Sequence, residues 1–147
     1  MAKEDVPVAA QGDRHRHTLE LTGSDAHALT RVRRWIREML VGVGHAHVLD
    51  VIQVADELAS NAYEHAGGPR AVHVCHRSAP RQTTVEVDDT SPLGRLTLGT
   101  SRFGKAACRG HGLQIVDQLT SAWGVRCTVE GRGGKTVWAE IPFPGRQ

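Results

Sequence analysis

The sequence ELASNAYEHA, residues 57–66, places Glu57 and Asn61 four positions apart. It ends a predicted helix that runs from about residue 47 to 66, in which apolar residues recur at helical spacing and GGP, residues 67–69, gives a strong stop. At about 100° per residue, the polar residues of this helix gather within about 40° of one another beside its apolar face. They are Asp50, Glu57, Asn61 and Glu64. A solvated helix face is the simplest interpretation of such a stripe.

Asn61 favours a second interpretation of the same stripe. Asparagine is a poor helix former, and in mid-helix it usually makes a hydrogen bond or binds a ligand. With Glu57 one turn away, a carboxylate and an amide oxygen share one side of the helix. Such oxygen atoms are the ligands that Mg²⁺ prefers, and a carboxylate can also act as a base. The pair alone is compatible with both interpretations.

The spacing of apolar residues predicts the helices and strands in the rest of the chain. The predicted elements are a strand at 17–21, a helix at 24–40, strands at 71–76 and 83–88, a helix at about 112–123, and a hairpin of strands at 125–130 and 136–141. We expect a flexible tail at residues 1–13, and a functional or disordered loop at residues 90–109, between the strand at 83–88 and the last helix. This order predicts an α+β fold, a two-layer α/β sandwich with helices on one face of a mixed, mainly antiparallel sheet.

Two further sequences could carry chemistry. VDDTSP, residues 87–92, puts acidic residues at the end of a predicted strand. A turn is the simple interpretation, and a carboxylate facing a cleft is the functional one. GHGLQIV, residues 110–116, runs a Gly-x-Gly directly into a helix, whose exposed amides can bind a phosphate. An ordinary loop-to-helix junction has the same pattern, and the sequence is neither a dinucleotide fingerprint nor a P-loop.

Taken in order, these sequences and the Gly-Lys-Thr of residues 134–136 resemble the motifs of the GHKL ATP-binding family. The resemblance covers about residues 17–142. Within that family, ELASNAYEHA and the Asp-Thr-Ser-Pro of residues 89–92 are most similar to the anti-sigma-factor serine/threonine kinase branch. It implies a Bergerat-type ATP-binding domain over residues 14–147, with a lid at about 93–109.

The resemblance also implies a role for each matched residue. Glu57 would be the catalytic base, and Asn61 would bind the Mg²⁺ that accompanies ATP. Asp89 would accept a hydrogen bond from the adenine amino group, assisted through water by Thr136. The phosphates would be bound by the backbone amides of Gly110, His111, Gly112 and Leu113. The chain departs from the family at two places. His111 stands where arginine is expected, and residues 89–92 lack the glycines that the family usually has there.

The function implied by the resemblance is that of an ATP- and Mg²⁺-dependent protein serine/threonine kinase that acts as an anti-sigma regulator. Such a protein would bind a sigma factor in one state and phosphorylate an anti-anti-sigma antagonist in the other. The alternative is a non-catalytic, nucleotide-gated protein-binding module of the same fold. Only phosphate turnover distinguishes the two.

Composition excludes other classes of protein. A chain of 147 residues is too short for two well-packed domains, and a net charge of +2 does not indicate direct binding of nucleic acid. No apolar run approaches the roughly 20 residues that span a bilayer, and the cysteines form no C-x-x-C pair. We therefore expect a cytoplasmic protein without membrane or nucleic-acid partners, and leave open whether it forms a homodimer. A basic cluster on the first helix could meet an acidic protein: Arg31, Arg33, Arg34 and Arg37.

Overall fold

The structure, a computed structural model, describes residues 14–21, 27–78, 81–90, 111–127 and 134–143. The elements of this part of the chain are β1 (Arg14–Glu20), α2 (Ala28–Met39), α3 (His45–Ala66), β2 (Pro69–Ser78), β3 (Arg81–Asp89), α4 (His111–Leu119), β4 (Ala122–Cys127) and β5 (Lys135–Pro142). None of the described helices is both long and apolar enough to cross a membrane. The expected tail and lid lie outside the described residues.

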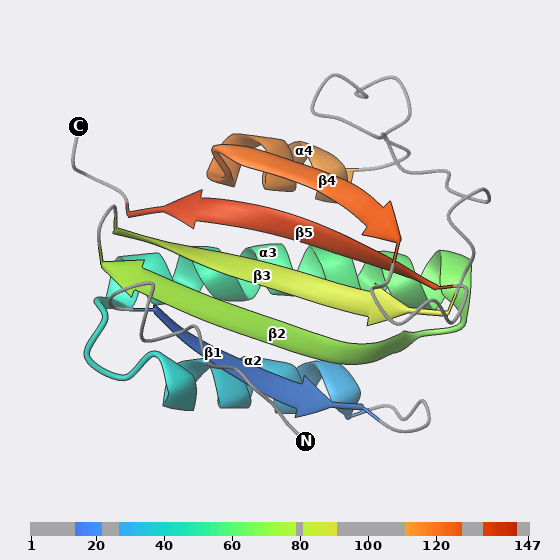
Figure 1. The fold of residues 1–147 in the computed structure, drawn as a ribbon, viewed down its shortest axis with the longest axis horizontal. Helices are drawn as coiled ribbons and strands as arrows, with labels where there is room; N and C mark the ends of the chain where they lie inside the picture. Colours follow the sequence, from blue (N-terminus) through green and yellow to red (C-terminus); the bar gives the residue numbers. More distant parts are fainter. Residues whose placement is uncertain (1–13, 22–26, 79–80, 91–110, 128–133, 144–147) are drawn as a thin grey trace.

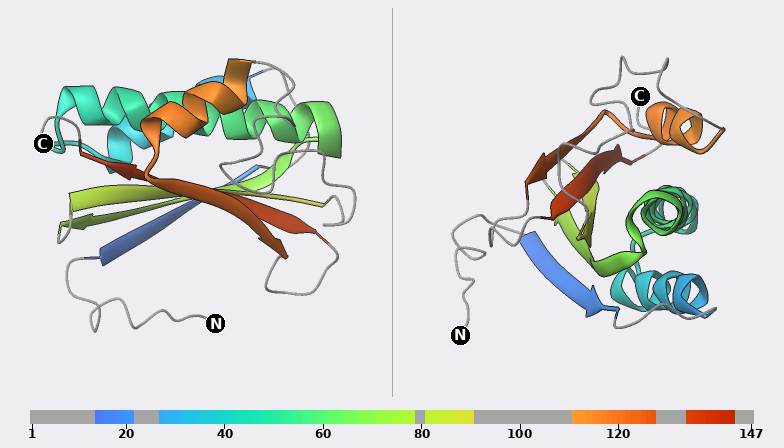
Figure 2. Two further views of the ribbon diagram at one scale, coloured as in Figure 1. Left: turned by 90° about the horizontal axis from the view of Figure 1, so that it is seen from above. Right: turned by 90° about the vertical axis from the view of Figure 1, so that its right-hand side faces the viewer.

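The strands form one sheet in the order β1-β2-β3-β5-β4 (Figure 1). Every pairing between neighbouring strands is antiparallel, so the described sheet has no parallel pair and is simpler than the mixed sheet that we predicted. Figure 2 shows the helices α2, α3 and α4 together on one side of this sheet. The predicted two-layer α+β architecture is confirmed.

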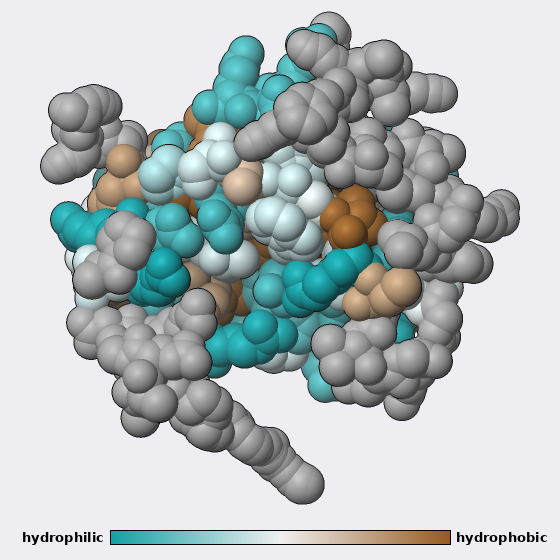
Figure 3. Space-filling view, turned by 45° about the horizontal axis from the view of Figure 1, so that its top comes forward, coloured by the Kyte–Doolittle hydropathy of each residue, from teal (hydrophilic) through white to brown (hydrophobic). Residues whose placement is uncertain are grey.

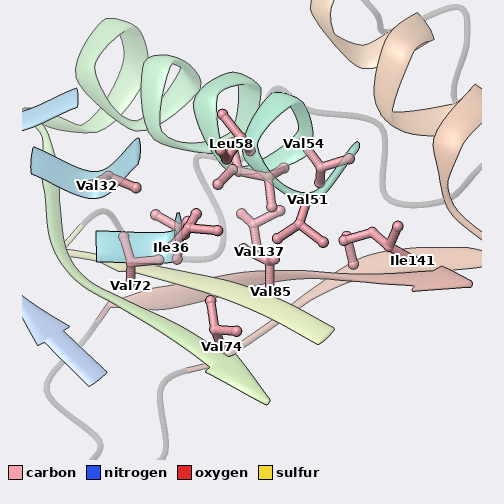
Figure 4. Close-up of a cluster of buried hydrophobic side chains, with 14 of the residues drawn as sticks. Val32, Ile36, Val51, Val54, Leu58, Val72, Val74, Val85, Val137 and Ile141 are labelled. Carbon is pink, nitrogen blue, oxygen red and sulfur yellow. The ribbon is translucent and has the colours of Figure 1, made fainter. Parts of the chain in front are cut away.

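The core lies between the helices and the sheet, where alternation along each strand sends every second side chain toward the helices. In β3, the residues at positions 83, 85, 87 and 89 are buried, and those between them are partly exposed. Figure 4 shows the valines of β2 and β3 meeting Val51, Val54 and Leu58 of α3. Burial of an aliphatic side chain of this size contributes roughly 1.5–3 kcal/mol relative to an exposed position.

The last helix ends earlier than the apolar pattern predicted. It ends at Leu119 instead of Trp123, and the tryptophan lies in β4. The Thr120 hydroxyl donates to the Val116 carbonyl at 2.7 Å, and the Ser121 backbone N–H donates to the Glu140 carbonyl of β5 at 2.9 Å. The helix therefore ends before Thr120, because hydroxyl side chains that bond to the backbone are unfavourable within a helix. The residues that follow pair with β5 instead.

The face of the sheet turned away from the helices is polar. Glu86 on β3 accepts one hydrogen bond from Arg16 at 3.5 Å and pairs with Arg126 of β4 at 3.1 Å. In the view of Figure 3, teal and white residues make up most of the coloured surface, and brown residues form small separate areas. The apolar side chains are thus concentrated on the helix side of the sheet. The buried Asp89 side chain also lies on that side.

Candidate functional site

Four segments that carry predicted site residues lie toward one end of the molecule, on the right in Figure 1. They are the C-terminal half of α3, the last residues of β3, the first residues of β5 and the beginning of α4. Sheet pairing fixes part of this arrangement, because Asp89 at the end of β3 lies between Pro69 of β2 and Lys135 of β5. The fold therefore brings together the segments that the sequence motifs singled out.

A tight turn connects α3 to the sheet at this end. Gly67 has left-handed backbone angles, and the Gly68 N–H donates to the Ala62 carbonyl at 2.9 Å. Gly68 has a φ of 112°, and a Cβ at this position would lie 3.1 Å from the Tyr63 ring. Only glycine fits here without strain. The turn leads directly into Pro69, which pairs with Asp89, so it places the end of α3 beside the end of β3.

Glu57 and Asn61 are both half-buried on α3, and each is followed in sequence by a buried residue, Leu58 and Ala62 respectively. The Asn61 side-chain nitrogen Nδ2 is buried and has no hydrogen-bond partner among the described residues. An unsatisfied buried donor costs about 1–3 kcal/mol, so this amide is suited to a ligand that supplies an acceptor. The same amide also offers an oxygen, and Glu57 offers a carboxylate, which are suitable donors for Mg²⁺. These residues therefore fit a Mg²⁺–phosphate group.

Asp89 lies on the helix side of the sheet and is only 1% exposed. Its two carboxylate oxygens, Oδ1 and Oδ2, accept hydrogen bonds from the Lys135 ammonium at 3.0 and 2.8 Å. Two charge-assisted hydrogen bonds hold this carboxylate in one orientation, as a fixed hydrogen-bond acceptor. Asp89 can thus receive an amino group of a ligand, as the resemblance implies.

Thr136 is not brought to Asp89. Its hydroxyl donates to Asp88 at 2.6 Å, on the opposite face of the sheet, because successive residues of a strand point to opposite faces. Asp88 also bonds to His73 Nε2 at 2.8 Å, and His73 Nδ1 lies 2.9 Å from the Thr18 hydroxyl. Burial tends to raise the pKa of Asp88, but the hydrogen bonds from His73 and Thr136 and the charges of His73 and Arg16 outweigh it and lower the pKa.

The phosphate-binding role predicted for residues 110–113 rests on the start of α4. The helix begins at His111, within the Gly-x-Gly sequence, and α4 packs against α3. The first amides of a helix have no partner within it and carry a partial positive charge, which favours an anion. Gly110 and the side chains of residues 111–113 lie outside the described residues, so the contribution of His111 stays a prediction.

Lys135 is the residue that the motifs did not assign. Its position could have been inferred from alternation, because Val137, Ala139 and Ile141 follow it at intervals of two and face the helices. The same phase places the Lys135 side chain on the buried face, opposite Asp89. The Gly-Lys-Thr motif contains this lysine, but only the pairing of β3 with β5 shows that its partner is Asp89.

Residues 22–141 match the family of the histidine kinase-like ATPase domain. The chain belongs to this family. The match includes all of the segments at the candidate site, and it confirms the GHKL resemblance of the motifs.

A solved structure agrees with the fold of this ATPase domain. It is the crystal structure of the RsbU and RsbW domains of Rv1364c from Mycobacterium tuberculosis, which superposes with a TM-score of 0.61 and 19% sequence identity. The match covers 87% of the present chain and 32% of that chain, so our chain spans about a third of its length. No curated protein sequence matches the chain.

Proposed function

We propose that this ATPase domain binds ATP and Mg²⁺ at the end formed by α3, β3 and α4, and that it is a protein serine/threonine kinase. The observation that carries the proposal is the buried Nδ2 of Asn61, which lies one helical turn from Glu57 and has no partner in the part of the chain that the structure describes. A structural stripe of polar residues would be satisfied by water or by neighbours, whereas a ligand site leaves a donor for its ligand. Family membership supports the nucleotide as that ligand.

Each of these residues would have a separate role in phosphate transfer. Glu57 would take the proton from a serine or threonine hydroxyl as its oxygen bonds to the γ-phosphorus and ADP leaves. Asn61 would hold Mg²⁺, which neutralises phosphate charge when bound. The first amides of α4 would bind phosphate oxygens, and Asp89 would accept the adenine amino group. Phosphoryl transfer depends mainly on such positioning and charge stabilisation.

We further propose that the kinase is an anti-sigma regulator. It would bind a sigma factor in one state and phosphorylate an anti-anti-sigma antagonist in the other. The similarity of ELASNAYEHA to the anti-sigma branch supports this assignment, and a structure with an RsbW domain is among its structural neighbours. The basic residues of α2 offer a surface for an acidic partner, although Arg33 already pairs with Asp56 of α3 at 3.0 Å.

Transfer of labelled γ-phosphate from ATP to candidate antagonist proteins tests the kinase proposal. Glu57→Ala should lower the transfer rate by about 10²–10⁴-fold, because a general base contributes on that order, and should leave ADP binding in place. Glu64→Ala is the matched control, since it removes an exposed carboxylate from the same helix. Undiminished transfer in Glu57→Ala would show that the base is misassigned. Nucleotide binding without transfer in the unmodified protein would favour the non-catalytic module instead.

A further inference from the structure

Lys135 makes a buried contact with the carboxylate proposed to recognise the base. Its Nζ atom lies 3.0 Å from Oδ1 and 2.8 Å from Oδ2 of Asp89. The exposed fractions of the two side chains are 5% for Lys135 and 2% for Asp89. The contact is therefore a charge pair shielded from water, in which one ammonium bonds to both oxygens of one carboxylate.

The position of this pair is determined by the sheet. Asp89 is the last residue of β3 and Lys135 is the first residue of β5, and the two face each other in the antiparallel register. The next residue, Thr136, points to the other face and bonds to Asp88. Of the two polar residues at the start of β5, it is thus the lysine that shares the helix side with Asp89.

The contact constrains what Asp89 can do. An isolated buried carboxylate is costly, and a directly bonded cation offsets that cost. Two bonds from one ammonium also fix the plane of the carboxylate. A carboxylate has about four acceptor positions, so one that bonds to an ammonium can also accept a hydrogen bond from an amino group.

We propose that Lys135 is a positioning residue for base recognition, which holds Asp89 in the orientation that accepts the 6-amino group of an adenine nucleotide. The inference rests on the proposed function, because it takes Asp89 as the residue that contacts the base. It adds that the preference for an amino-bearing purine depends on a lysine that does not itself need to touch the nucleotide.

The test is a thermodynamic cycle between Lys135 and the amino group, measured by calorimetry on the full chain. The ligands are ADP and purine riboside 5′-diphosphate, which lacks only the amino group. The wild-type protein should bind ADP about tenfold or more tightly than the analogue, which is the gain in affinity expected from one hydrogen bond to a charged group. Lys135→Met should abolish this preference by lowering the affinity for ADP, while the affinity for the analogue stays nearly unchanged. A purely structural role would weaken both ligands equally.

Two further variants complete the design. Arg126→Met removes a cation from the adjacent strand β4, where it pairs with Glu86 on the other face, and should keep the wild-type preference. Lys135→Gln keeps a donor without the charge and replaces Lys135→Met if that variant does not fold; its preference should also fall. A wild-type preference in the Lys135 variant would overturn the inference and leave the proposed function intact. Failure of the wild-type protein to bind ADP would overturn the proposed function itself.

Discussion

The histidine at position 47 should make the fold sensitive to acid. His47 lies near the start of α3 and is 1% exposed. Its ring stacks on Phe143 at a centroid distance of 3.9 Å, and its Nε2 lies 2.7 Å from the Thr83 hydroxyl. Burial, followed by the nearby charges of His76 and Arg81, lowers the pKa of His47 from 6.5 to about 4. The imidazole is therefore neutral in the folded protein at neutral pH.

The sign of the effect follows from proton uptake. Between about pH 6.5 and pH 4 the unfolded chain binds a proton at this position and the folded chain does not, so the free energy of unfolding falls as the pH is lowered. A pKa difference of this size corresponds to about 3 kcal/mol at most. That is a large fraction of the roughly 5–15 kcal/mol by which domains are usually stable.

Urea unfolding at a series of pH values measures this contribution. In His47→Phe, which keeps an aromatic ring at the stack, the decrease in unfolding free energy between pH 7 and pH 4 should be smaller than in the wild type by up to about 3 kcal/mol. His45→Phe is the control, because His45 is exposed at the first residue of the same helix and its replacement should leave the wild-type profile. Parallel profiles for His47→Phe and the wild type would refute the reasoning.

Three other substitutions test the packing around the sheet by denaturant unfolding. Ile36→Ala should lower stability by about 2–5 kcal/mol, because Ile36 is fully buried against the sheet; a loss below about 1 kcal/mol would contradict this packing. Gly68→Ala should cost about 1–3 kcal/mol, since it strains a φ of 112° and crowds the Tyr63 ring; unchanged stability would contradict the turn. Asp88→Asn should destabilise the protein at neutral pH, and the loss should shrink as the pH falls below 3.8, because a lowered pKa stabilises the fold only while the carboxylate is charged. A loss that persists in acid would show that the hydrogen bonds to His73, not the charge, are what the fold requires.

Sequence patterns predicted the features that depend on local periodicity. The helix that carries Glu57 and Asn61 was predicted to begin at about residue 47 and begins at His45, and its end at Ala66 matches the glycine stop. The strands that follow it were also predicted, because alternation of apolar residues is a local signal. The grouping of Asn61 with Asp89 at one end could be inferred only from the family resemblance.

Other features depend on pairing between distant segments and were missed for that reason. The last helix was predicted to reach Trp123, but the segment after Leu119 pairs with β5, which no local period reveals. Thr136 was expected to assist Asp89 through water, and the register of β5 turns its hydroxyl toward Asp88 on the other face. The same register gives Asp89 a lysine partner that the motif alone does not indicate.

The most direct measurement of the central claim is a calorimetric titration of ADP, with and without Mg²⁺, into the wild-type protein and Asn61→Ala. We expect the wild type to bind ADP more tightly with Mg²⁺, and Asn61→Ala to lose that gain because the amide oxygen proposed to bind the metal is removed. Gln53→Ala, which removes an exposed amide from the same helix, should behave as the wild type. No binding by the wild type at nucleotide concentrations on the order of 1 mM would contradict the proposed nucleotide site. An unchanged Mg²⁺ dependence in Asn61→Ala would contradict the assignment of its metal ligand.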